Sequence, residues 1–274
     1  MKKKVIVAIL CVVLAISCVS MLFACDSKTG LEDGTLNIAT NCEFEPFEYL
    51  DDQGKPTGID MDIVTAIAKE LKVKVEIKDM AFESVVSAVG SGSQDLAAAG
   101  LTVDEERKQS VDFTKSYFNS NQVVIAKNGN VILSLTDKAK VEEMLSGKKI
   151  GVQNGTTGYK YASGDSDDYN GVTAAENVKG FASGALAVQA LLNGQVDYVI
   201  IDAVPAEKLC VANDGITAST VVLTGEEYAF AVKKGNSKLL KQIDDALAKL
   251  IENGTIEEIF QKYGLNSGLN ENVG

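Results

Sequence analysis

Short apolar runs alternate with stretches of helical periodicity along most of the chain. Between residues 59 and 71 the apolar side chains recur at the spacing of an amphipathic helix, and the runs on either side are short and rich in β-formers. This alternation predicts parallel α/β units, in which a helix joins one strand to the next. The predicted strands span residues 36–40, 73–77, 95–99, 149–153 and 196–201, and the predicted helices span residues 59–71, 82–89, 157–162, 183–193, 238–252 and 255–263.

Two stretches of the chain repeat the same order of residue types. "VVSAVGSGSQDLAAAG" and "AVQALLNGQVDYVIID" each consist of a helical segment, a glycine, an aspartate three residues later and an apolar strand, and five residues past each aspartate come Gly100 and Asp202. Open α/β sheets bind ligands at the carboxyl ends of their strands. The repeat therefore predicts two similar lobes, each of which offers one segment to a shared site.

Two extended runs, residues 122–127 and 228–232, are the predicted crossings between the lobes. A chain that crosses out and back has a discontinuous first lobe and an inserted second lobe. We expect the first lobe to comprise residues 34–122 and 227–274 and the second lobe to comprise residues 123–226.

The N-terminal residues are typical of an export signal. Three lysines precede an almost wholly apolar stretch from residue 5 to residue 21, and Leu22-Phe23-Ala24-Cys25 follows. This order resembles the lipobox of bacterial lipoproteins, in which the cysteine is lipidated. It predicts a signal peptide over residues 1–24, an acylated Cys25 and a polar tether over residues 25–33, with the protein held on the outer face of the cell membrane. A plain signal peptide and an uncleaved anchor are the alternatives.

Charge and composition exclude several classes of function. Removal of residues 1–24, which carry three lysines and no acid, changes the formal charge from −12 to −15, so neither nucleic acid nor an anionic bilayer is an expected partner. The chain contains no histidine, which excludes Ser-His-Asp and Cys-His catalysis and most zinc sites. We expect no cofactor. Of the five cysteines, Cys42 and Cys210 belong to the body of the protein, and we expect two buried free thiols, with a disulfide as the alternative.

Arg107 and Asp202 are the two charged residues whose surroundings call for an explanation. Arg107 lies in "AGLTVDEERKQSVDF" and either faces solvent at the start of a helix or turns inward to hold an anion. A guanidinium suits the second role, because its planar fork matches a carboxylate and stays charged when desolvated. Asp202 follows four apolar residues, and a carboxylate at the end of a buried strand needs a partner or caps the next helix.

Six motifs in order resemble the family 3 bacterial extracellular solute-binding proteins. They are "FEPFEY", "GIDMDI", "AGLTVDEERKQSVDF", "IGVQNGTTG", "GQVDYVIID" and "NGTIEEIFQKYG", and the resemblance as a whole covers residues 34–264. The resemblance implies the α/β type II periplasmic-binding-protein fold: two lobes, each a mostly parallel sheet flanked by helices, joined by two hinge strands. It also implies a role as the amino-acid-binding component of an ABC importer.

The resemblance further implies a set of ligand contacts. Arg107 and Thr102 would bind the α-carboxylate of the amino acid, and Asp202 would bind its α-ammonium. Thr156 and Thr157 would reach the carboxylate from the second lobe, as an ordinary helix cap also allows. Phe44 and Phe82 would enclose the ligand side chain, although a core position is the alternative. The remaining implied contacts are Asn41, Ala99, Gly100 and Gln153.

The implied function is capture of a free L-amino acid by a monomer, without catalysis, and delivery to a membrane permease. A polar or basic side chain is favoured. Asn41 is frequently aspartate in receptors for cationic amino acids, however, which leaves a basic ligand open unless Glu43 supplies the charge. The alternatives are a cyclic-acid dehydratase of the same fold, for which only Glu43 is a candidate acid, and a sensory ligand-binding protein.

Overall fold

Two five-stranded sheets organise the computed structural model, which describes residue 31 and residues 34–267. The first sheet has the order β5-β1-β6-β15-β7 and the second β11-β10-β12-β9-β13. The first sheet contains β5 (Lys74–Asp79), β1 (Thr35–Thr40), β6 (Leu96–Ala97), β15 (Ala231–Lys233) and β7 (Val111–Phe113); the second contains β11 (Val178–Phe181), β10 (Ile150–Gln153), β12 (Tyr198–Asp202), β9 (Gln122–Lys127) and β13 (Ile216–Ala218). The predicted signal peptide, Cys25 and most of the tether lie outside the described residues.

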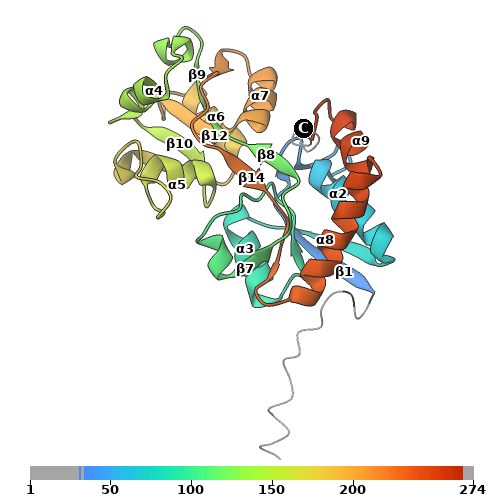
Figure 1. Cartoon of the computed structure of the whole chain (residues 1–274). Helices are drawn as coiled ribbons and strands as arrows, with labels where there is room; N and C mark the ends of the chain where they lie inside the picture. Colours follow the sequence, from blue (N-terminus) through green and yellow to red (C-terminus); the bar gives the residue numbers. More distant parts are fainter. Residues whose placement is uncertain (1–30, 32–33, 268–274) are drawn as a thin grey trace, which may run out of the picture.

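In each sheet four strands run in one direction and one strand runs against them. The reversed strands are β15 in the first sheet and β9 in the second, and each pairs antiparallel with both of its neighbours. Each reversed strand is also the first one that the chain enters after it crosses between the sheets. The two-lobed, mostly parallel α/β architecture is therefore confirmed, with Figure 1 showing the two halves side by side.

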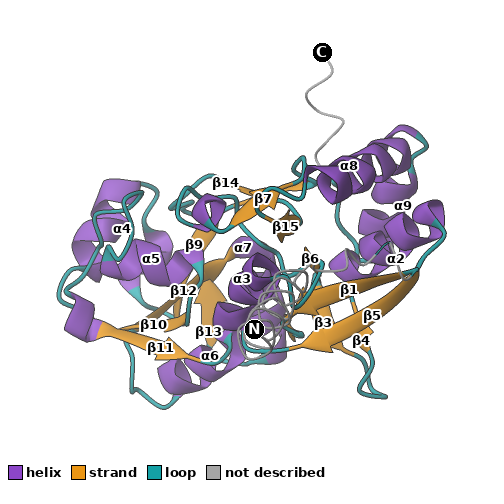
Figure 2. Ribbon diagram, turned by 90° about the horizontal axis from the view of Figure 1, so that it is seen from below, coloured by secondary structure: helices purple, strands orange, loops and turns teal. Residues whose placement is uncertain are grey.

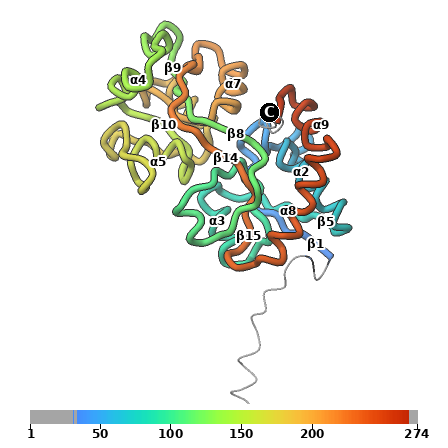
Figure 3. Tube along the Cα trace, in the orientation of Figure 1, coloured from blue at the N-terminus to red at the C-terminus, as the bar shows by residue number. Residues whose placement is uncertain are grey.

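The crossings lie a few residues before the predicted ones. β8 (Phe118–Ser120) and β14 (Glu226–Tyr228) pair antiparallel in a two-stranded sheet of their own, and the tube in Figure 3 shows them running together between the two halves. The expectation that residues 122–127 form a hinge strand is wrong, because this run is β9, whose first five residues are buried inside the second sheet. Residues 228–232 span the end of β14 and the start of β15. The lobe limits at residues 122 and 227 stay a prediction.

Helices flank both sheets (Figures 1 and 2). In Figure 2 α8, α9 and α2 lie together beside the first sheet, and α8 and α9 both contact α2. The helices of this half are α2 (Ile59–Leu71), α3 (Phe82–Ser91), α8 (Ser237–Glu252) and α9 (Thr255–Lys262); those of the second half are α4 (Lys138–Leu145), α5 (Thr157–Ser163), α6 (Gly184–Leu192) and α7 (Ala203–Ala212). Among the described residues, every helix is too short or too polar to span a bilayer.

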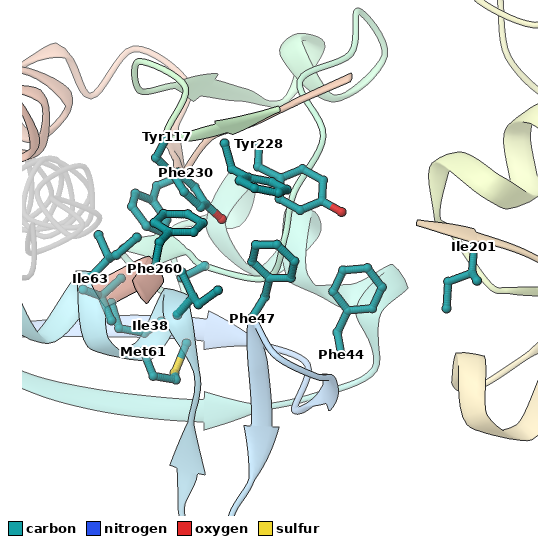
Figure 4. Close-up of a cluster of buried hydrophobic side chains, with 14 of the residues drawn as sticks. Ile38, Phe44, Phe47, Met61, Ile63, Tyr117, Ile201, Tyr228, Phe230 and Phe260 are labelled. Carbon is teal, nitrogen blue, oxygen red and sulfur yellow. The ribbon is translucent and has the colours of Figure 1, made fainter. Parts of the chain in front are cut away.

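An aromatic cluster fixes the crossing strands to the first half. Tyr117 stacks on Phe230 with 4.5 Å between ring centroids, and Phe118 stacks on Phe260 of α9 at 5.4 Å. Phe47 meets the ring of Tyr228 edge-on with 5.2 Å between ring centroids, and Figure 4 shows the two side chains as neighbours. Because these rings are almost completely buried, the crossing strands begin from a rigid base in the first half.

The start of α2 holds the loop that leads to the candidate site. Asp60 is fully buried and accepts hydrogen bonds from the Gly100 amide, at 3.0 Å, and from the Tyr117 hydroxyl, at 2.7 Å. Burial raises the pKa of Asp60 to about 7, although both hydrogen bonds oppose this rise. The carboxyl end of β6 is therefore tied both to α2 and to the segment that enters the crossing.

Gly58 sets the close approach of α2 to the loop after β2 (Glu43–Phe44). Its φ is +122°, and a Cβ at this position would lie 2.2 Å from the backbone oxygen of Phe47. We expect Gly58→Ala to lower the free energy of unfolding by about 3–5 kcal/mol, because backbone strain and a backbone clash add together.

Gly54→Ala is the matched control for this prediction. Gly54 has a φ of +74°, but a Cβ there would meet no atom within 4 Å, so the loss should be about 1 kcal/mol. Urea unfolding of both variants, followed by circular dichroism, measures the difference. Equal losses in the two variants would contradict the proposed clash.

Candidate functional site

The sequence-predicted site residues meet where the two halves of the molecule are in contact. Ten of them line one cavity: Asn41, Phe44, Phe82, Gly100, Thr102, Arg107, Gln153, Thr156, Thr157 and Asp202. The eleventh, Ala99, is 1% exposed and packs in the apolar cluster beneath α3 instead. The cavity volume is about 10 Å3, which is about the space that one water molecule needs.

Arg107 turns inward. It lies in a short 3-10 helix, η1 (Arg107–Gln109), and its side chain is only 6% exposed, which rules out the solvent-facing alternative. The Nη1 group donates to the Thr102 carbonyl at 2.7 Å, and Nη2 donates to the Gly155 carbonyl of the second half at 3.1 Å. The guanidinium carbon lies 5.5 Å from the ring centre of Phe82. Burial lowers the pKa of Arg107, and the nearby carboxylate of Asp104 opposes that effect most.

Asp202 occupies the carboxyl end of β12, but its side chain does not cap α7. Its Oδ1 atom instead accepts hydrogen bonds from the Ser120 hydroxyl, at 2.9 Å, and from the Tyr228 hydroxyl, at 2.5 Å. These donors come from β8 and β14, the two crossing strands. Burial, and then the charge of Glu226, raise the pKa of Asp202 to about 7.

The threonines have different roles. Thr156 is the N-cap of α5: its Oγ1 accepts from the Tyr159 amide at 3.3 Å and donates to the Gln153 carbonyl at 2.8 Å. Thr157 is the first residue of α5 and lines the cavity. Thr102 donates its hydroxyl to Glu226 Oε2 at 2.7 Å, so in this structure that hydroxyl supports a crossing strand.

Two amides join the halves at the other end of the cavity. Gln153, the last residue of β10, donates from Nε2 to Asn41 Oδ1 at 2.8 Å. Asn41 follows β1 and donates its own amide to the Met80 carbonyl at 2.9 Å. Phe44 packs closely over Gly100, where a Cβ would come within 2.9 Å of the ring. Glu43 is exposed and is not among the residues that line this cavity.

Sequence reasoning missed the polar residues of the crossing strands. Glu226 is 7% exposed and accepts hydrogen bonds from Thr102 and from Thr224, at 2.7 and 2.5 Å. In the sequence it is one of two adjacent acids, which are typical of a solvated turn. The only signal was their position just before the apolar run that returns to the first half.

The two cysteines of the body carry no disulfide in this structure. Both Cys42 and Cys210 are free thiols, as predicted, but only Cys42 is buried and Cys210 is half-buried. Burial raises the pKa of Cys42 to about 12, so its thiolate is disfavoured at neutral pH. Within residue 31 and residues 34–267 there is no group of three or more acidic or thiol side chains arranged to hold a metal ion.

Known proteins resemble this chain over nearly its whole body. A probable histidine-binding protein of Neisseria gonorrhoeae is 33% identical over 235 residues, which cover 84% of this chain and 83% of that protein. The solved structure of an ancestral arginine-binding protein bound to glutamine is 39% identical, with a TM-score of 0.74 and coverage of 84% and 97%. An ancestral amino-acid-binding protein described as a precursor of cyclohexadienyl dehydratase is 27% identical, with a TM-score of 0.75 and coverage of 87% and 99%.

The family model of the bacterial extracellular solute-binding proteins, family 3, matches residues 36–266. This match spans both sheets, both crossing strands and every residue that lines the cavity. The chain therefore belongs to the family 3 bacterial extracellular solute-binding proteins.

Proposed function

We propose that the protein captures a free L-amino acid between its two halves and delivers it to the membrane permease of an ABC importer. The observation that carries this proposal is that Arg107 and Asp202 line the same cavity. One comes from each half, and both are about 6% exposed. Opposite charges at two ends of a buried site match the carboxylate and ammonium of a zwitterion. The names of the similar proteins, which refer to amino-acid binding, support the same function.

The ligand would replace contacts that now join the halves. Its carboxylate would lie against the Arg107 guanidinium and the start of α5, and its ammonium against Asp202. Its side chain would pass between Phe44 and Phe82 toward the amides of Asn41 and Gln153. Those amides offer both donors and acceptors, which favours a polar or basic side chain.

A cyclic-acid dehydratase is the second candidate. The observation that favours it is Asp202 itself, because a buried carboxyl whose pKa is raised to about 7 can donate a proton near neutral pH. The similarity to the ancestral precursor of a dehydratase points the same way. Incubation with a prephenate-like acid separates the two: turnover would favour the enzyme, whereas binding without turnover would favour the receptor.

We further propose that the protein acts as a monomer outside the cytoplasmic membrane, held there by lipid on Cys25. The order of lysines, apolar run and Leu22–Cys25 supports the anchor. Stable attachment requires more than one acyl chain, which a diacylglyceryl cysteine supplies.

The first prediction from this proposed function tests the two charges of the site. We expect Arg107→Ala and Asp202→Asn each to weaken binding about 100-fold or more, because each leaves one ligand charge buried without its partner. A thermal-shift screen of the twenty standard L-amino acids identifies the probe, and calorimetry measures its affinity for each variant. Lys108→Ala, which removes an exposed cation next to Arg107, is the control and should bind like the wild type. Wild-type affinity in a folded Arg107 or Asp202 variant would remove that residue from the site.

The second prediction concerns pH. Ionised Asp202 is the form that pairs with an ammonium, and its pKa is raised to about 7, so binding must expel a proton below neutral pH. We expect affinity to fall as pH drops from 8 to 5, by up to tenfold per unit, and to level off above pH 8. Without ligand the same shift makes the folded state bind more protons than the unfolded state, so this contribution to stability declines as pH rises toward 7.

Calorimetry across pH measures this dependence. Asp202→Asn should give a much flatter profile, because the remaining buried acids do not pair with the ammonium. A wild-type affinity that is constant from pH 5 to 8 would show that Asp202 does not titrate on binding.

The third prediction concerns the anchor. Cys25→Ser should leave the exported chain without acyl groups, so it should move from the membrane fraction to the soluble fraction. Mass spectrometry of the wild-type mature N-terminus should show acylated Cys25. An unmodified N-terminus in the wild type would exclude the lipid anchor.

A further inference from the structure

We propose that Lys160 is a positioning residue for ligand capture: it extends from the second half to Asp104 and thereby fixes Arg107 when the two halves close. The inference rests on the proposed function, because Arg107 is the group assigned to the ligand carboxylate. Lys160 was not among the predicted site residues, and it does not line the cavity that those residues form.

The contact crosses between the halves. Lys160 lies on α5 of the second half, and its Nζ atom is 2.9 Å from Asp104 Oδ2 in the loop before η1 of the first half. Both side chains are only 10% exposed. A second carboxylate, Glu106, approaches the same ammonium at 2.7 Å but is 64% exposed, so water screens that pair much more strongly.

Asp104 connects Lys160 to Arg107. The Oδ1 atom of Asp104 accepts from the Arg107 backbone amide at 2.7 Å, and its Oδ2 atom lies 3.3 Å from Arg107 Nε. Lys160 therefore contacts the same carboxylate oxygen that faces the guanidinium. A carboxylate held by cations on two sides has less freedom to rotate, and the orientation of the Arg107 fork depends on that carboxylate.

The charge state of Asp104 supports this arrangement. Burial by itself would raise the pKa of Asp104, but Arg107 and Lys160 together hold that pKa below its ordinary value. Asp104 is therefore ionised across the neutral pH range, where a transport protein must bind and release its ligand.

The geometry of α5 links the same contact to the cavity. Gly155, which accepts from Arg107 Nη2, precedes α5, and Thr157 begins it. Lys160 follows Thr157 by three residues, so one short segment supplies a carbonyl, a cavity-lining threonine and the bridging ammonium. When the halves separate, the Lys160 contact with Asp104 breaks and both charges return to water. The contact thus stabilises the closed form and should act mainly on ligand dissociation.

The experiment compares Lys160→Met, Lys160→Arg and the control Lys108→Met. Lys108 belongs to the first half, pairs with Glu105 at 2.7 Å within that half and is 45% exposed, so its removal causes the same charge change without affecting the bridge. The probe is the tightest-binding member of the twenty standard L-amino acids. Stopped-flow measurement of tyrosine fluorescence gives association and dissociation rates, and small-angle scattering without ligand gives the radius of gyration.

We expect Lys160→Met to raise the dissociation rate about tenfold, with the association rate changed less than about threefold. Lys160→Arg should restore most of the loss, because arginine keeps the charge and can reach the same carboxylate. Lys108→Met should leave both rates near those of the wild type. The ligand-free Lys160→Met protein should also have a larger radius of gyration than the wild type.

Two results would overturn the proposal: an unchanged dissociation rate in a folded Lys160→Met protein, or equal effects of Lys160→Met and Lys108→Met. If the wild type binds no amino acid, the proposed function fails. The scattering comparison then decides the bridge by itself, with an unchanged radius of gyration rejecting it and a larger one supporting it.

Discussion

The rest of the site depends on the Asp202 carboxylate, which accepts a hydrogen bond from each of the two crossing strands. Asp202 accepts from Ser120 on β8 and from Tyr228 on β14. The ring of Tyr228 also packs against Phe47 and Phe118 in the aromatic cluster. The carboxylate at the end of a second-half strand is thereby connected to the core of the first half. A change in its charge or position acts on the two segments that any relative motion of the halves must bend.

A buried acid near the site, Glu48, adds little to the charge around Arg107. Glu48 is completely buried, and among the described residues neither of its carboxyl oxygens has a hydrogen-bond partner. Burial, followed by the charges of Asp60 and Asp202, raises the pKa of Glu48 well above its ordinary value. A carboxyl in such surroundings is protonated at neutral pH, because ionising it would cost far more than neutral burial. Glu48 therefore contributes little negative charge near the cavity, and Asp104 is the carboxylate that acts most strongly on Arg107.

Local patterns in the sequence predicted local structure well. Contacts between residues far apart in the sequence could not be predicted from such patterns. The helix over residues 59–71 matches α2 because its apolar spacing and the flanking Gly58 act within a few turns. The prediction that Arg107 turns inward rested on the resemblance of its motif to the family. The prediction that the site residues lie together rested also on their positions after the ends of strands. The hinge was misplaced because an apolar β-branched run has the same appearance in a buried sheet strand as in a crossing. Glu226 pairs with Thr102 across 124 residues, a contact that no local pattern indicates.

Contacts between the halves fall into two classes, those inside the cavity and those outside it, and we expect them to have opposite effects on affinity. Arg107 with Gly155, and Asn41 with Gln153, lie inside the cavity, where a ligand competes for the same donors and acceptors. Any stability that they give the closed form is lost when the ligand enters, so strengthening them would weaken binding. Lys160 and Asp104 do not line the cavity, so on our proposal a bound ligand would not compete for their contact. The contact of Lys160 with Asp104 and the bound ligand would both stabilise the closed form, so their contributions to its stability would add. Affinity in such a protein can therefore be tuned without altering any residue that touches the amino acid.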